Sequence, residues 1–83
     1  MNDRAAPKAA ITTRNELEFT VFCIESIAAK LGVTAQQVYS AVTERSGILK
    51  TYIVPEYEAL HTQSKDYIID DVLDVLKEAG VSI

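Results

Sequence analysis

One histidine, His61, and one cysteine, Cys23, limit the chemistry that this 83-residue chain can do. Histidine is the side chain whose ordinary pKa lies nearest neutrality, so it is the natural general acid or base. Catalysis also needs a nucleophile or a second acid–base group beside it, and the sequence has no nucleophile motif such as Gly-x-Ser-x-Gly. A single cysteine excludes an internal disulfide and a cysteine-based zinc site. We therefore expect no enzyme, no catalytic residue, no metal and no cofactor, with His61 packed at the end of a helix.

Acidic residues gather toward the end of the sequence, where they could bind a hard cation or a basic partner. Four of them recur at spacings that put them on one side of a helix: Asp70, Asp71, Asp74 and Glu78. Two carboxylates with water could hold a cation, but metal sites of useful affinity take their ligands from a turn. We expect instead a solvated acidic rim that helps to dock a basic partner.

Residues 26–45 resemble a helix-turn-helix unit, with Ala28, Gly32 and Val38 at three of its defining positions. The second helix of this unit presents side chains of types that contact DNA: Gln36, Gln37, Ser40 and Arg45. The charge opposes this function, because eight Lys and Arg residues stand against twelve Asp and Glu, for a net charge of −4. DNA binding by a dimer, which would gather more positive charge, is therefore the alternative hypothesis.

Helices would position these side chains, and the sequence marks where the helices begin and end. Two pairs of residues have the spacing of a capping box: Thr13 with Glu16, and Thr34 with Gln37. Three glycines are suited to the left-handed conformation that ends a helix: Gly32, Gly47 and Gly80. Ser64 is a suitable first cap for the last helix, and Pro55 interrupts the helical segment before it.

These signals predict an all-α fold, a compact bundle of three main helices and one short helical segment that Pro55 interrupts. The main helices are expected over 13–31, 34–46 and 64–79. Residues 1–11 are expected to form a flexible tail, and residues 12–83 one helical domain.

The apolar residues of each predicted helix indicate its inward side. The first helix has a stripe at the helical period: Leu17, Val21, Ile24, Ala28 and Leu31. Phe19 and Phe22 project roughly opposite it, so this helix is either central in its own domain or half covered by another chain. The inward side of the second helix is expected to hold Ala35, Val38, Tyr39, Ala41 and Val42, and that of the last helix Ile68, Val72, Val75 and Ala79.

About three-quarters of the chain resembles a family of small bacterial domains of unknown function. The resemblance rests on short motifs and on one longer run: Phe22-Cys23-Ile24-Glu25, Leu31-Gly32-Val33, Val38-Tyr39, Tyr52 to Gln63, Tyr67-Ile68 and Asp70-Asp71. Its most specific part is Leu60-His61-Thr62-Gln63. The family implies no enzymatic activity. Some members are encoded beside genes for proteins similar to ADP-ribosyltransferase-like toxins, which implies an antitoxin-like or accessory binding role.

Together these observations predict a non-enzymatic protein-binding module in the bacterial cytoplasm, whose partner is another protein such as the product of an adjacent gene. The expected partner-binding residues are rigid aromatic side chains and their neighbours: Phe19, Phe22, Tyr52, Tyr57, His61 and Gln63. A homodimer would also bury apolar surface that so short a chain leaves exposed. The sequence has no apolar run of membrane-spanning length, so we expect no membrane contact.

Overall fold

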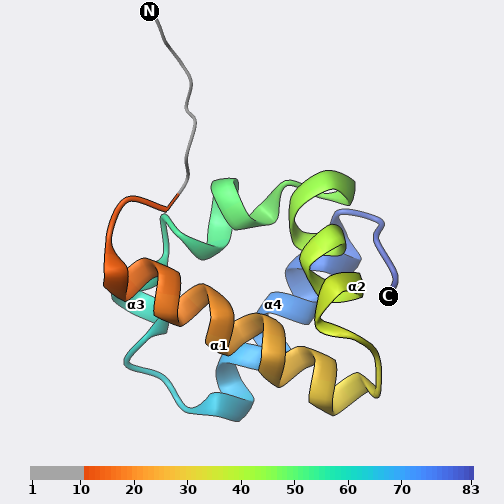
Figure 1. Ribbon diagram of the computed structural model, residues 1–83, viewed down its shortest axis with the longest axis horizontal. Helices are drawn as coiled ribbons and strands as arrows, with labels where there is room; N and C mark the ends of the chain where they lie inside the picture. The colour runs from red at the N-terminus through yellow and green to blue at the C-terminus, as the bar shows by residue number, and fades with distance from the viewer. Residues whose placement is uncertain (1–10) are drawn as a thin grey trace, which may run out of the picture.

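The computed structural model describes residues 11–83, and all regular structure within them is helical (Figure 1). The elements in chain order are α1 (Arg14–Leu31), α2 (Ala35–Ser40), η2 (Ala41–Arg45), η3 (Leu49–Ile53), α3 (Tyr57–Leu60) and α4 (Lys65–Glu78). The short segments η2 and η3 are π-helical, and η2 continues α2 without a break. The predicted all-α class is confirmed. The predicted tail lies outside the described residues except for Ile11, and none of the helices described is both long and apolar enough to cross a membrane.

Hydrogen bonds at the helix starts follow the predicted caps with one difference. The capping box of α2 is complete: Thr34 Oγ1 accepts from the Gln37 N–H at 3.1 Å, and Gln37 Oε1 accepts from the Thr34 N–H at 2.9 Å. At α1, Thr13 Oγ1 accepts from the Glu16 N–H at 3.1 Å. The Glu16 carboxylate, however, accepts from the Thr12 N–H at 2.8 Å and from the Thr12 hydroxyl at 3.1 Å. The predicted box at Thr13 is half formed because Thr12 offers that carboxylate two donors.

The helix ends lie at the predicted glycines. Gly32 adopts a left-handed conformation with φ 69°, which costs a glycine little, and Gly47 and Gly80 do the same. The backbone before Pro55 differs from the prediction. Val54 has helical angles of φ −71° and ψ −47° because its N–H closes the last turn of η3 on the Leu49 carbonyl, at 3.0 Å. This hydrogen bond outweighs the preference of a residue before proline for extended backbone.

The inward side of α1 is only partly the predicted one: Ile24 and Ala28 of the predicted stripe are buried, but the other three residues are exposed. The buried side centres on Cys23 and Ile27, each 1% exposed, whereas Leu17, Val21 and Leu31 of the predicted stripe are 50%, 43% and 40% exposed. Apolar residues cover most of the circumference of α1, so the helical period alone does not choose between neighbouring stripes. Packing of α1 on both α2 and α4 buries the side that carries Cys23 and leaves part of the predicted stripe in water.

The core lies between α1, the continuous α2–η2 segment and α4, which passes behind α1 and α2 in Figure 1. From the predicted inward sides, Val38, Ala41, Val42, Ile68 and Val72 are buried. Three residues of those sides are exposed instead: Ala35, Tyr39 and Ala79. The short elements complete the core with Leu49, Ile53 and Leu60.

Thr20 places a hydroxyl in this core without a hydrogen-bond partner. The residue is 3% exposed, and its Oγ1 makes no hydrogen bond. We expect Thr20→Val to raise the free energy of unfolding by about 1 kcal/mol, because valine keeps the shape and removes an unsatisfied polar group. The control Thr34→Val loses the cap of α2 and should lower the same quantity by about 1 kcal/mol. Urea unfolding curves measure both, and a destabilised Thr20→Val would contradict this account.

Candidate functional site

Four of the six predicted partner-binding residues form one aromatic row, in the order Phe22, Phe19, Tyr57, His61. The ring centroids of Phe22 and Phe19 lie 6.3 Å apart, and Phe19 meets Tyr57 edge to face at 5.4 Å. Tyr57 stacks on His61 at 4.5 Å with 13° between the ring planes. Phe19 is buried, whereas Phe22 is 37% exposed and His61 is exposed. The row therefore links α1 to α3 through the core and reaches the surface at both ends.

The other two predicted partner-binding residues lie apart from the aromatic row. The Tyr52 hydroxyl donates a short hydrogen bond to the Asp71 carboxylate and so joins η3 to α4. This hydrogen bond, partial burial and the charge of Asp71 raise the pKa of the Tyr52 phenol. Gln63 is exposed in the turn before α4, where its N–H donates to the Leu60 carbonyl at 2.9 Å.

The predicted acidic rim of α4 is divided between internal contacts and solvent. Asp70 Oδ1 accepts from Lys30 Nζ at 3.1 Å, an exposed ion pair that connects α4 to the end of α1. Asp71 is half-buried beneath the Tyr52 hydroxyl, and so does not belong to a solvated face. Asp74 and Glu78 are exposed. Among the described residues, no group of three or more His, Cys, Asp or Glu side chains could hold a metal ion.

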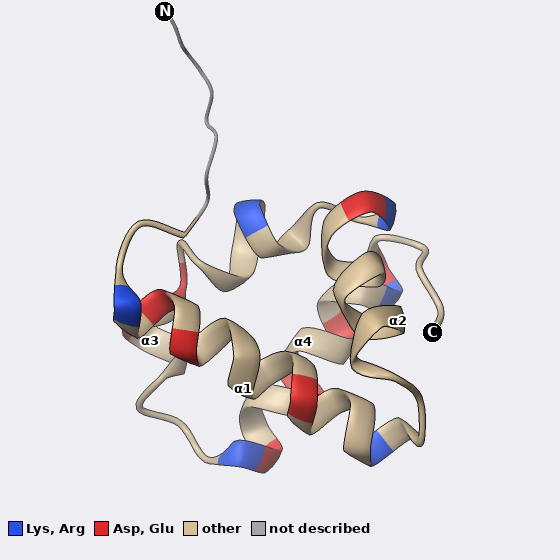
Figure 2. Ribbon diagram, viewed as in Figure 1, with Lys and Arg blue, Asp and Glu red and all other residues tan. Residues whose placement is uncertain are grey.

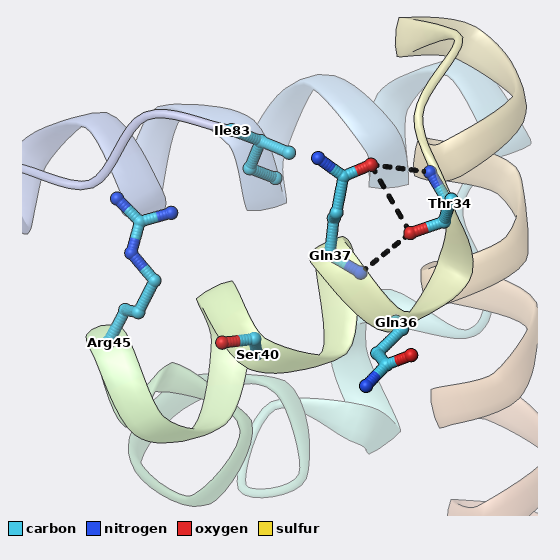
Figure 3. A pocket seen from close by; sticks show the side chains of 6 residues that line it. All are labelled: Thr34, Gln36, Gln37, Ser40, Arg45 and Ile83. Carbon is cyan, nitrogen blue, oxygen red and sulfur yellow. Dashed lines mark hydrogen bonds between the residues drawn. The ribbon is translucent and has the colours of Figure 1, made fainter.

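The four candidate DNA-contacting residues line one shallow hollow of about 350 Å³, together with Thr34 and Ile83 (Figure 3). Two of the four are already engaged within the chain. The side chain of Gln37 completes the capping box with Thr34, and Arg45 Nη1 donates to the Ser82 carbonyl at 2.8 Å. Gln36 is exposed and Ser40 is half-buried. The elements bring the four residues together, but two of the polar groups that would contact DNA have partners of their own.

A second hollow, of about 300 Å³, lies between α1 and α2. Its lining combines apolar side chains with two polar ones at the edge: Val21, Ile24, Glu25, Ala35, Gln36 and Tyr39. Tyr39 is 53% exposed, and Leu17, one helical turn before Val21, is exposed beside it. The sequence did not predict this surface, because these apolar residues were expected to lie in the core. One feature of the sequence indicates such a surface: α1 has more apolar positions than a single inward side can bury.

Cys23 is buried in the core and carries no chemistry at the surface. Burial raises the pKa of its thiol to about 12. A thiol of that kind is neutral at physiological pH and unreactive, because the thiolate is the nucleophile.

The chain matches the model of a known protein family. A protein-family model described as "Protein of unknown function (DUF3791)" matches residues 18–79. The matched range begins in the first turns of α1 and ends directly after α4. The match therefore includes the whole aromatic row and all the helical residues that line the two hollows. No curated protein and no solved structure matches the chain.

The raised pKa values of Cys23 and Tyr52 predict that stability falls at alkaline pH. In the unfolded chain these groups ionise near their ordinary pKa values of 9.0 and 10.0, whereas folding keeps both neutral. Their contribution is thus complete below about pH 9 and is lost as the pH rises above the unfolded values. Tyr52→Phe should cost about 1 kcal/mol at pH 7, because the hydrogen bond to Asp71 is lost. Its decline in stability above pH 10 should also be shallower than that of the wild type. Urea unfolding at pH 7, 9 and 10.5 measures both effects, and parallel declines would contradict the role of Tyr52.

Proposed function

The chain belongs to the DUF3791 family, and from this premise we propose that it is a non-enzymatic module that binds another protein through the outer face of α1. We define the outer face of α1 as Leu17, Val21 and Phe22. Glu18 lies among these residues in the sequence and is exposed with them.

The observation that carries the proposal is the exposure of these three apolar side chains on one helix. Leu17, Val21 and Phe22 fall within six residues, while the core occupies the opposite side of the same helix. An apolar cluster of this kind is unfavourable in water and is typical of a surface that a partner covers. Tyr39 extends the cluster on α2, and Tyr57 with His61 extends it on α3. Aromatic side chains held in place by stacking are suited to interface anchors, because they lose little entropy on binding.

His61 and Cys23 are the side chains that acid–base or nucleophilic catalysis would use first, and both are engaged in packing within the chain. His61 stacks on Tyr57, and Cys23 is sealed in the core with a neutral thiol. This supports binding over catalysis. The family resemblance described above makes the product of an adjacent gene the first partner to test, in an antitoxin-like or accessory role. We also place the protein in the cytoplasm, where an unpaired thiol such as Cys23 stays reduced.

The alternative, DNA binding through α2, has weaker support. Gln37 and Arg45 are held by bonds within the chain, and α2 itself carries no charged residue. A dimer could add phosphate contacts, but α2 of each copy brings no charge, and in η2 the charge of Arg45 is offset by that of Glu44. Protein docking uses the exposed apolar surface directly and is therefore the preferred function.

The proposal predicts that substitutions on the outer face of α1 disrupt a complex without disrupting the fold. Phe22→Ala and Val21→Asp should each weaken binding of the adjacent gene product by about ten-fold or more, as expected for anchors at an interface. Tyr67→Ala is the control, because Tyr67 is also a large exposed side chain, lies on α4 away from the outer face of α1, and should leave the affinity unchanged. Titration calorimetry on purified proteins, with circular dichroism to verify folding, gives the measurement.

Two results would contradict this function. One is the absence of a complex between the folded protein and the adjacent gene product. The other is wild-type affinity in both α1 variants. Binding to the promoter of its own gene, with a steep salt dependence that Gln36→Ala weakens, would favour the DNA alternative instead.

A further inference from the structure

We propose that the partner segment is an amphipathic helix that inserts an apolar side chain between α1 and α2 and carries Lys or Arg along one flank. This inference rests on the proposed function and specifies the chemistry of the partner. Its elements are the hollow lined by Val21, Ile24 and Tyr39, and the acidic edge formed by Glu18 and Glu25.

The hollow between α1 and α2 has the size and chemistry of a receptor for an apolar side chain. Its volume of about 300 Å³ lies at the lower end of the range for small-molecule sites. Val21, Ile24, Ala35 and Tyr39 supply apolar lining, and the walls are α1 and α2, which are in contact and joined by a short loop (Figure 1). An apolar stripe of a third helix can pack into such a groove by the same geometry that packs helices in a core.

The charges beside the hollow favour a basic partner. Glu25 lines the hollow itself, and Glu18 lies seven residues earlier, which puts it two turns along the same side of α1. No basic residue occurs in α1 between Arg14 and Lys30, and Figure 2 shows acidic residues along α1 with basic ones only at its two ends. Lys30 is paired with Asp70. The polar side chain that α2 contributes to the lining, Gln36, is uncharged, as is the rest of α2. Complementary charge is therefore needed along one flank only.

The spacing of the two glutamates sets the spacing of the partner's bases. At 1.5 Å per residue, seven residues of α1 place Glu18 and Glu25 roughly 10 Å apart along the helix axis. A partner helix that lies along α1 meets both with basic residues seven apart, and its apolar residues then fall three or four positions from each base.

The same charges oppose a second copy of this chain on the surface. Two α1 helices related by a two-fold axis place Glu18 and Glu25 of one copy near the same residues of the other. With no base on α1 between Arg14 and Lys30, these contacts join like charges across the interface. A partner with the opposite charge avoids this repulsion.

A designed peptide pair tests the inference without the natural partner. The probe is a helical peptide of about 18 residues, long enough to hold helical structure in water, with a leucine stripe flanked by Lys residues seven apart. The control peptide has Glu at those positions and the same leucines. We expect the Lys peptide to bind the whole protein about five-fold more tightly than the Glu peptide at low salt, with the difference disappearing near 1 M salt. Fluorescence anisotropy of labelled peptides measures the ratio.

Variants of the protein locate the effect. Glu18→Gln with Glu25→Gln should bring the two peptides to equal affinity, whereas Asp74→Asn with Glu78→Gln, the same charge change on α4, should leave the ratio intact. Val21→Asp should weaken both peptides. Sedimentation of the free protein should give a monomer.

Three outcomes would overturn the inference: equal affinity of the two peptides for the wild type, no binding of either, or a dimer that Val21→Asp dissociates. The proposed function would survive the first two if the outer-face variants still lose the adjacent gene product. The proposed function would be contradicted if the outer-face variants bound the adjacent gene product as tightly as the wild type, whatever the result with the peptides.

Discussion

The rest of this structure depends on how α1 is oriented. The helix is apolar around most of its circumference, yet α4 and the α2–η2 segment cover only part of it. The side with Cys23 and Ile27 enters the core, and this choice places Leu17 and Val21 at the surface. A small domain buries little apolar surface within itself. A partner that covers the exposed apolar part of α1 would therefore add stabilising burial. The exposure of the outer face of α1 is thus a consequence of the same packing that builds the core.

The capping residues and glycines in the sequence correctly predicted where the helices begin and end. The hydroxyl caps at Thr13, Thr34 and Ser64 and the left-handed glycines act through bonds within a few residues, so the local sequence is sufficient to locate helix ends. The side of α4 that faces the core was also predictable for Ile68 and Val72, because the acidic residues on that helix leave one apolar stripe.

The sidedness of α1 and of α2 could not be read in the same way. Several stripes of α1 are apolar, and tertiary contacts with α2 and α4 decide which of them is buried. The contacts with α4 are distant in sequence: Lys30 and Asp70, which form an ion pair, are 40 residues apart. The aromatic ring of Tyr39 could lie in a core or at a surface, and the packing of α2 on α1 leaves it exposed. The bond between Tyr52 and Asp71 is likewise a tertiary contact, and it removes one carboxylate from a face that looked uniformly solvated. The aromatic row contains four residues proposed from the sequence, but their mutual stacking depends on α1 meeting α3.

The central claim is that a partner covers the outer face of α1. Methyl-resolved NMR of the protein, recorded as the adjacent gene product is added, tests it most directly. The account predicts that the methyl signals of Leu17 and Val21 shift or broaden, while those of the buried Ile68 and Val72 on α4 stay in place. Perturbation confined to α4, with unchanged signals from Leu17 and Val21, would contradict it.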